Sequence, residues 1–249
     1  MPLSGRVALI TGASRGLGRG IALALAPGGV RLVLAGRDRE KLAETAAAAR
    51  GLGAEAEIFT ADVSDEAQVR QLERDVVAQF GQVNILVNNA GINIRKACLD
   101  TTLDEWNSVL HTNLTSVFLL CRSFVPYMKS HGWGRIVNIA SMMGHVSIPQ
   151  RTAYSASKAG VIAFTRALAI ELAADNIGVV SVSPGLFDTD MTVPILNDPA
   201  KLAPLLAGTL TGRPGRPGEV GKLVAYLCSE DSSFITGSDI LIDGGWTAQ

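Results

Sequence analysis

The amino-acid sequence predicts an α/β fold in which a seven-stranded parallel sheet is doubly wound, with helices on both of its faces. Short β-branched apolar runs alternate with longer segments of helical period along the 249 residues. The short runs are nearly continuous in apolar residues, which is typical of strands buried on both faces. Apolar residues make up 47% of the chain and charged residues only 18%, so a large buried core is expected. Residues 1–249 are predicted to form a single domain.

Strand-like and helical segments follow one another in regular alternation. The expected strands are Val7–Ile10, Arg31–Ala35, Glu57–Thr60, Ile85–Val87, Arg135–Ile139, Val179–Val182 and Ile240–Ile242. The expected helices are Leu17–Ala26, Arg39–Arg50, Glu66–Phe80, Leu103–Met128, Ala153–Ala174 and Pro217–Ser229. A helix between two strands is the usual crossover of a parallel sheet, so this order predicts parallel pairing.

Turn and cap residues support several of these boundaries. The Pro-Gly-Gly run at 27–29 stops the first helix, and Thr102 with Glu105 has the spacing of a capping box. The stretch at about 185–216 mixes Pro, Gly, Asn and Asp with apolar residues. It is expected to be a long loop that serves as a lid or substrate-binding segment.

Composition and charge exclude several classes of protein. There are 22 Lys and Arg against 23 Asp and Glu, a net charge of −1, which gives no sign of a nucleic-acid partner. The apolar stretch Thr115–Met128 is broken by Arg122 and is shorter than the ~20 residues that span a bilayer. No secretory signal is recognised, so we expect a cytoplasmic protein without a membrane partner. Cys98, Cys121 and Cys228 form no CxxC pair and are interpreted as reduced, buried thiols, with no metal site.

A glycine-rich turn follows the first predicted strand directly and opens the first predicted helix. It reads Thr-Gly-Ala-Ser-Arg-Gly-Leu-Gly over residues 11–18. Absent side chains let the backbone approach a ligand closely, and the helix N-terminus offers unpaired N–H groups to a pyrophosphate. The turn therefore indicates a dinucleotide site built from Gly12, Ser14, Arg15, Gly16, Leu17 and Gly18. Its GxxxGxG spacing differs from the common GxGxxG, and a tight turn without a ligand is the alternative.

The same segment also satisfies GxSxG, the nucleophile elbow of α/β-hydrolases, with Ser14 as the nucleophile. That fold places several strands and the oxyanion loop before the serine, whereas only eleven residues precede Gly12 here. The histidines, His111, His131 and His145, lie in mid-chain rather than after a late acid. A hydrolase is therefore not favoured.

Two arginines indicate which dinucleotide the site prefers. Folds that use NAD place an acid at the end of the second strand, about 20 residues past the glycine motif. Gly36 occupies that place here, and Arg37 follows it. A guanidinium suits a 2′-phosphate through forked, charge-assisted hydrogen bonds, and Arg15 offers a second one. We therefore expect NADP(H) to be preferred over NAD(H), the alternative being that both arginines are merely solvated.

Three residues combine the side chains needed for proton transfer at a carbonyl. Tyr154 and Lys158 are four apart on a predicted helix and share one face. The ordinary pKa of tyrosine, about 10, is too high for a base near neutral pH, and a nearby ammonium favours the phenolate. Ser141 ends the fifth strand, at the edge where open α/β sheets bind ligands. Each residue alone also has an ordinary interpretation, as a helix-surface or loop side chain.

Six motifs occur in one order along the chain and carry a family resemblance. They are the glycine turn at 11–18, Asn88-Asn89-Ala90-Gly91, Asn113, Ser141, Tyr154-Ser155-Ala156-Ser157-Lys158 and Pro184-Gly185. In order and approximate spacing they resemble the short-chain dehydrogenase/reductase family over essentially the whole chain. The resemblance implies a single-domain Rossmann fold. It also implies hydride transfer between NADP(H) and a ketone or secondary alcohol, with no metal required.

The resemblance further implies a role for each matching position. Tyr154 would be the general acid in reduction and the base in oxidation, and Lys158 would lower its pKa and bind the nicotinamide ribose. Ser141 would orient the carbonyl, and Asn113 would hold a water of a proton relay. The remaining positions would contact the cofactor: Asp62 and Val63 at the adenine, Asn89, Ala90 and Gly91 along the cofactor wall, and Pro184, Gly185 and Thr189 beside the nicotinamide.

The substrate and the assembly are predicted more coarsely. The residues expected on the substrate side are Met142, Met143, His145, Ile148, Gln150, Leu186 and Met191, which suggest a largely apolar pocket. For His145 a solvated loop position is favoured over a substrate contact. The layout is similar to 3-oxoacyl carrier-protein reductases, and Ser141-Met142-Met143 to gluconate 5-dehydrogenases, so a thioester and a sugar or sugar acid both stay open. The resemblance also implies a homotetramer. A dinucleotide-binding sensor without turnover is the alternative from another class, although such a protein would not need the serine, tyrosine and lysine.

Overall fold

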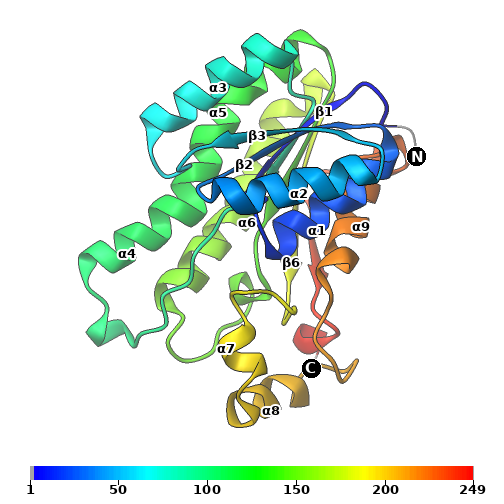
Figure 1. The fold of residues 1–249 in the computed structure, drawn as a ribbon. Helices are drawn as coiled ribbons and strands as arrows, with labels where there is room; N and C mark the ends of the chain where they lie inside the picture. Colours follow the sequence, from blue (N-terminus) through cyan, green and yellow to red (C-terminus); the bar gives the residue numbers. More distant parts are fainter. Residues whose placement is uncertain (1–2, 249) are drawn as a thin grey trace.

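The computed structural model describes residues 3–248 and contains one seven-stranded sheet in the order β3-β2-β1-β4-β5-β6-β7 (Figure 1). Every pair of neighbouring strands is parallel, as the sequence predicts. The strands are β1 (Val7–Thr11), β2 (Arg31–Gly36), β3 (Glu55–Thr60), β4 (Ile85–Asn88), β5 (Gly134–Ile139), β6 (Ile177–Pro184) and β7 (Asp239–Ile242). The predicted doubly wound fold class is thereby confirmed.

Helices cover both faces of this sheet. They are α1 (Gly16–Leu25), α2 (Arg39–Gly51), α3 (Glu66–Phe80), α4 (Leu103–Leu110), α5 (Ser116–Ser130), α6 (Thr152–Leu172), α7 (Val193–Leu196), α8 (Pro199–Ala207) and α9 (Pro217–Leu227). Buried residues of α1, α2 and α9 belong to one apolar cluster, and those of α3, α5 and α6 belong to a second one. No helix within residues 3–248 is both long and apolar enough to cross a membrane.

Strand β1 shows how one apolar run supplies both clusters. Ala8 and Ile10 belong to the cluster with α1 and α9, whereas Val7 and Leu9 belong to the cluster with α5 and α6. Successive side chains of a strand point to opposite faces, so a strand between two helical layers needs apolar residues at every position. The edge strand β3 departs from this pattern, because Glu55 is exposed.

The predicted helix from Leu103 to Met128 contains an irregularity that its period does not reveal. Between α4 and α5 the chain forms a π-helical turn, His111–Thr115, so the helical path is continuous but locally wider. An extra residue in one turn leaves the spacing of apolar residues on either side nearly unchanged. Such turns occur frequently at functional sites.

The stretch at 185–216, expected to be an irregular loop, instead contains α7 and α8. Asp198 caps α8 by accepting hydrogen bonds from the N–H groups of Ala200 (3.1 Å) and Lys201 (3.4 Å). Pro199 occupies the first helical position, where its missing N–H costs no hydrogen bond. Figure 1 shows these helices beyond the carboxyl end of β6, below the sheet. The helix-start signal Asp-Pro was present, but the turn-rich composition around it favoured a loop.

The cysteines differ from one another in exposure. Cys121 and Cys228 are buried, as predicted, and burial raises the pKa of each thiol to about 12. Cys98 is exposed, so its interpretation as a buried thiol was wrong. It lies in a short turn, Cys98–Asp100, that packs outside both apolar clusters.

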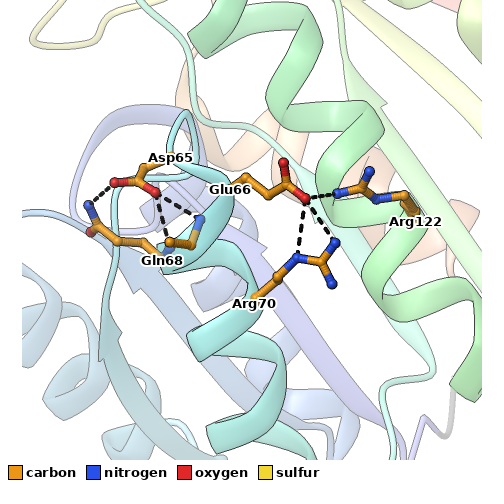
Figure 2. Close-up of polar contacts among 6 residues, drawn as sticks. Asp65, Glu66, Gln68, Arg70 and Arg122 are labelled. Carbon is orange, nitrogen blue, oxygen red and sulfur yellow. Dashed lines mark hydrogen bonds and ion pairs between the residues drawn. The ribbon is translucent and has the colours of Figure 1, made fainter.

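The N-terminus of α3 carries a group of paired charges (Figure 2). Asp65 caps the helix by accepting from the N–H groups of Ala67 (2.8 Å) and Gln68 (3.3 Å). Glu66 accepts from the Arg70 guanidinium (2.9 Å) on its own helix and from Arg122 Nη2 of α5 (2.6 Å). Hydrogen bonds from both arginines hold the pKa of Glu66 below its usual value. This group links α3 to α5 on the outer side of the helical layer.

Candidate active site

A cavity of about 720 Å³ lies at the carboxyl edge of the sheet, lined by residues that follow strands β1 to β6. Open α/β sheets bind ligands at this edge, where the strand order reverses. Most of the predicted site residues line it: Gly12, Ser14, Arg15, Gly16, Leu17, Arg37, Asp62, Val63, Asn89, Ala90, Gly91, Ser141, Tyr154, Lys158, Pro184, Gly185 and Thr189. Gly18 and Asn113 do not line it, and both lie behind its wall.

The glycine turn is held against the end of β4 by Asn89. The side-chain Nδ2 of Asn89 donates to the carbonyl oxygens of Thr11 (2.9 Å) and Gly12 (3.2 Å). Gly12 has a φ of +63°, and a Cβ there would lie 2.9 Å from Asn89 Nδ2. A Cβ at Gly18 would collide with the carbonyl oxygen of Gly12. Gly18 therefore serves the packing of the turn rather than lining the cavity.

The N-terminus of α1 faces the cavity with unpaired backbone groups. Arg19 is the first residue whose N–H joins the helical ladder, donating to the carbonyl oxygen of Arg15 over 3.2 Å. The N–H groups of the turn before it have no partner within the helix, as at any helix N-terminus. Gly16 and Leu17, both from this turn, line the cavity. The arrangement suits a pyrophosphate.

Arg37 lies at the end of β2, in the part of the cavity that also contains Asp62. Its Nη1 atom is 3.4 Å from Asp62 Oδ2, and the arginine side chain is 71% exposed. Burial raises the pKa of Asp62, but hydrogen bonds from Ser64 and the charge of Arg37 outweigh it and hold the pKa below its usual value. Because Arg37 is exposed, its guanidinium can turn from this weak contact towards a ligand.

Tyr154 and Ser141 both line the cavity. Burial raises the pKa of Tyr154, while a hydrogen bond with Ser141 and the positive charge of Arg151 act in the opposite direction. The phenol therefore keeps its proton at neutral pH. Ser141 Oγ also accepts from the N–H of Met143 (3.1 Å), which fixes the serine side chain at the end of β5.

Lys158 is buried, with its ammonium held by the backbone rather than by the tyrosine. Its Nζ atom donates to the carbonyl oxygen of Ile139 (2.7 Å) and lies 5.8 Å from the centroid of the Tyr154 ring. Burial lowers the pKa of Lys158 to about 8. The pKa of Tyr154 is raised in this geometry; Ser141 and Arg151 oppose the rise, and Lys158, to which the resemblance assigns a lowering of this pKa, is not among the causes.

Asn113 occupies the π-helical turn and braces the wall of the cavity from behind. Its Oδ1 accepts from the N–H of Ile92 (2.8 Å), and its Nδ2 donates to the carbonyl oxygen of Ile92 (2.9 Å) and to Ser157 Oγ (3.0 Å). A Cβ added at Gly91 would lie 3.3 Å from Asn113 Oδ1 and 3.6 Å from Lys158 Nζ. Asn113 thus joins the segment after β4 to α6, one residue before the lysine.

The expected substrate side is largely where the sequence places it. Met142, Met143, Ile148, Leu186 and Met191 line the cavity, whereas His145 and Gln150 do not. His145 instead contacts β7, where its Nε2 atom lies 2.6 Å from Asp239 Oδ2.

Three polar residues on the substrate side escaped the sequence interpretation: Asn93, Arg95 and Arg151 line the same cavity. A signal was available for Arg151, because it stands three residues before Tyr154 and so lies one helical turn away. Nothing in the local sequence around Asn93 and Arg95 marks them, since they enter the cavity through the path of the chain after β4.

These lining residues decide between the two chemistries that the glycine turn allows. None of the cavity-lining residues within 3–248 is a histidine, so Ser14 has no base and the hydrolase alternative is rejected. A dinucleotide-type turn joined to a proton-carrying tyrosine instead defines the class of oxidoreductases that interconvert carbonyls and alcohols with a nicotinamide cofactor.

Comparisons with known proteins agree with this class. Residues 12–247 match the family model described as enoyl-(acyl carrier protein) reductase. The chain is 37% identical over 245 residues to the 3-oxoacyl-[acyl-carrier-protein] reductase FabG of Thermotoga maritima, covering 98% of this chain and 99% of the relative. It is 38% identical over 243 residues to the cyclopentanol dehydrogenase of a Comamonas strain, covering 98% and 97%.

A solved structure from Beutenbergia cavernae, described as an NAD(P)-dependent gluconate 5-dehydrogenase with NADP bound, has a TM-score of 0.95 and 36% identity, covering 100% of this chain and 99% of the other. The chain therefore belongs to the short-chain dehydrogenase/reductase family, whose members use a nicotinamide cofactor. It is an oxidoreductase acting on CH–OH and C=O groups.

Proposed function

We propose that this protein is an NADP(H)-dependent carbonyl reductase that transfers hydride between the nicotinamide and a ketone or secondary alcohol. The observation that carries the proposal is that one cavity holds both a catalytic group and a cofactor-type group of residues. The first is Ser141, Tyr154 and Lys158, and the second is the glycine turn with Arg15 and Arg37. When bound, the nicotinamide supplies or accepts the hydride. The protein supplies the binding surface, the orientation of the carbonyl and the proton.

Tyr154 delivers the proton to the carbonyl oxygen in the direction of reduction. Its raised pKa keeps the phenol protonated near neutral pH, which is the form an acid requires. Ser141, which lines the same cavity as Tyr154, orients the carbonyl between the two hydroxyl groups. Lys158 binds the nicotinamide ribose through its ammonium group, whose pKa burial lowers to about 8. Asn113 positions the proton relay behind the lysine.

Arg37 and Arg15 favour NADP(H) over NAD(H). Both line the cavity, and no acid stands at the end of β2, where Gly36 completes the strand. Arg15 lies at the N-cap of α1 without a side-chain capping bond, and the polar contact of the Arg37 side chain within residues 3–248 is the one of 3.4 Å with Asp62. Both guanidinium groups can therefore reach a 2′-phosphate. The NADP bound to the Beutenbergia cavernae relative supports the same choice.

The helical stretch at 185–216 contributes the outer wall of the substrate side. Leu186, Met191, Ile195 and Leu205 from this stretch line the cavity.

A cytoplasmic homotetramer is the assembly we propose, supported by large apolar side chains left exposed on α5, α6 and β7. Phe118 is 45% exposed, Ile170 81% and Leu241 41%. The free state of all the cysteines supports a reducing compartment.

The testing experiment is an assay of NADPH oxidation with the purified protein against neutral ketones, oxo acids, sugars and 3-oxoacyl thioesters. We expect turnover with at least one class, and slower turnover with NADH. The relatives named above favour two rival substrates, a 3-oxoacyl thioester and a sugar acid, and the panel separates them. NADPH binding without turnover of any compound would contradict the proposal and favour a dinucleotide-binding sensor.

A further inference from the structure

Two further arginines, Arg95 and Arg151, line the cavity that contains Tyr154. Arg151 is close enough to Tyr154 for its charge to lower the tyrosine pKa, and Arg95 is close enough to Arg151 to lower the arginine pKa. Arg151 is the N-cap residue of α6, so about one helical turn separates it from Tyr154. These positive charges are therefore on the substrate side, apart from Arg15 and Arg37 in the cofactor part.

Arg151 is buried without a compensating negative charge. It is 8% exposed, and among the described residues its guanidinium donates one long hydrogen bond, of 3.4 Å, to the carbonyl oxygen of the adjacent Gln150. Within residues 3–248, no carboxylate lies within 4.0 Å of either Arg95 or Arg151. A buried charge is costly unless it is paired, and a second cation beside it adds to the cost.

The other buried arginine of the protein shows what compensation looks like. Arg135 is 5% exposed, and it stacks at 5.0 Å on the ring of Trp133. The charge of Glu230 raises its pKa and so opposes the effect of burial. Within residues 3–248, the guanidinium of Arg151 has neither a stacked aromatic ring nor a paired carboxylate. The charge of Arg95 lowers its pKa, and only Tyr154 acts in the opposite direction.

The acids that line the cavity, Asp38, Asp62 and Asp190, do not pair with Arg151. Asp38 caps α2 by accepting from the N–H of Lys41 (3.1 Å), and Asp62 is paired with Arg37 (3.4 Å). Asp190 lies in the exposed turn that leads to α7. The negative charge that would neutralise Arg151 must therefore come from a ligand.

The local backbone places Arg151 at some energetic cost. Gln150 has a φ of +67°, in the left-handed region that a residue with a side chain seldom adopts. Gln150 itself is exposed, so its own side chain does not explain the strain. The strained residue turns the chain into α6 in such a way that the next side chain is buried at the cavity. Strain of this kind is concentrated at functional positions.

A polar acceptor accompanies the two cations. Asn93 lines the cavity two residues before Arg95, and its Oδ1 atom is buried without a hydrogen-bond partner. A ligand that satisfies this part of the cavity therefore carries an anionic group and a hydrogen-bond donor.

We propose that Arg151, assisted by Arg95, binds an oxyanion of the substrate, so that the preferred substrate is an oxo acid or hydroxy acid rather than a neutral ketone. The oxyanion is a carboxylate or a phosphate, a few bonds from the reacting carbonyl. This inference rests on the proposed carbonyl reductase function. It also disfavours a 3-oxoacyl thioester, because the thioester group next to the reacting ketone is neutral.

The test compares matched charged and neutral substrates with NADPH. Suitable pairs are 3-oxobutanoate and 5-oxohexanoate with their methyl esters, and dihydroxyacetone phosphate with dihydroxyacetone. We expect the wild-type kcat/KM to be about 10- to 100-fold higher for the charged member of at least one pair, as for a charge-assisted hydrogen-bonded contact. The first two pairs report a carboxylate preference and the third reports a phosphate preference. Equal rates within every pair would overturn the proposal.

Variants assign the preference to Arg151. Arg151→Met should lower the ratio of kcat/KM between the charged substrate and its neutral partner about 10- to 100-fold, mainly through the KM of the charged substrate, because an effect on Tyr154 alters both members of a pair equally. Arg151→Lys should restore part of the loss, and Arg95→Met should give a smaller loss. The matched control is Arg70→Met, an exposed arginine outside the cavity, which should leave the preference unchanged. An equal loss for charged and neutral substrates in Arg151→Met would indicate an effect on Tyr154 and contradict anion binding.

A binding titration separates failure of this inference from failure of the proposed function. If no compound is turned over, the reductase function is contradicted, and fluorescence of the NADPH complex still reports binding of each acid and its ester. Tighter binding of the acid that is lost in Arg151→Met would support the anion site. Equal binding of acid and ester would overturn it.

Discussion

Charged side chains are exposed and paired at the N-terminus of α3, whereas two cations of the cavity are buried and have no carboxylate partner among the described residues. In the first region Glu66 pairs with Arg70 and Arg122, and the three side chains are about half exposed. In the second, Lys158 and Arg151 are 4% and 8% exposed and contact backbone carbonyls but, within residues 3–248, no carboxylate. The paired charges cost the folded state little free energy and also add little stability, because water screens them.

The unpaired charges of the cavity are the expensive ones, and they point to function. Burial lowers the pKa of both Lys158 and Arg151, a sign that the folded protein holds these cations against their preference for water. Perturbed groups of this kind cluster at functional sites. If the comparison is correct, changes in the cavity should alter chemistry strongly, and changes at the α3 N-terminus should alter almost nothing.

The largest effect is expected for Tyr154→Phe. Removing the phenolic hydroxyl removes the proton donor, so kcat should fall by about 10³-fold or more while NADPH binding is retained. Steady-state kinetics and a fluorescence titration with NADPH measure the two quantities. Tyr127→Phe is the matched control, because its hydroxyl contacts Glu73 (3.1 Å) outside the cavity. Retention of most activity in Tyr154→Phe would refute the acid role.

A smaller effect is expected for Arg37→Ser on cofactor choice. Loss of a charged contact with the 2′-phosphate should lower kcat/KM for NADPH about 10- to 100-fold and leave that for NADH nearly unchanged. Arg39→Ser, two residues further on and outside the lining of the cavity, is the control. The same ratio of NADPH to NADH activity in the wild type and Arg37→Ser would show that Arg37 is merely solvated.

Lys158→Met should stabilise the fold at neutral pH. The lysine is charged up to a pH of about 10.5 in the unfolded chain but only up to about 8 in the folded protein. The folded state therefore carries a penalty that is complete below pH 8 and disappears as the pH rises to 10.5. We expect the variant to be about 1–3 kcal/mol more stable at pH 7, allowing for the lost hydrogen bond to Ile139, and the gain to shrink by pH 10.

Urea unfolding of the wild type and Lys158→Met at pH 7 and pH 10 measures this gain. A stability difference that does not change with pH would show that packing, rather than the buried charge, is responsible. Lys129→Met is a suitable control, because this lysine is exposed and paired with Asp175 (2.7 Å).

The smallest effect is expected for Arg70→Met at the paired group of Figure 2. Glu66 keeps its contact with Arg122, and exposed pairs contribute little, so Tm should change by no more than about 2–4 °C. Activity should be unaffected. A larger loss of Tm, measured by thermal melting at low and high salt, would mean that this group contributes more to stability than its exposure indicates.

The sequence predicted the sheet closely because strands buried on both faces leave a strong local pattern. Every strand lies within two residues of its expected bounds. Prediction failed where the deciding interaction was not local. The π-helical turn at His111–Thr115 preserves the apolar spacing around it, and α8 begins in a stretch whose composition favours turns. His145, weighed as a substrate contact, is drawn to Asp239 on a strand that is 94 residues away in the chain.

The candidate site divides in the same way. The order of the glycine turn, Ser141, Tyr154 and Lys158 along the chain was sufficient to predict residues that line one cavity, because each motif is local and sits at the end of a strand or on one helix face. Tertiary structure alone decided that the pKa of Tyr154 is raised and that Lys158 contacts Ile139. It also brought Arg95 towards Arg151. Burial and the meeting of distant segments set these properties, and neither is encoded in the period or spacing of a single stretch of sequence.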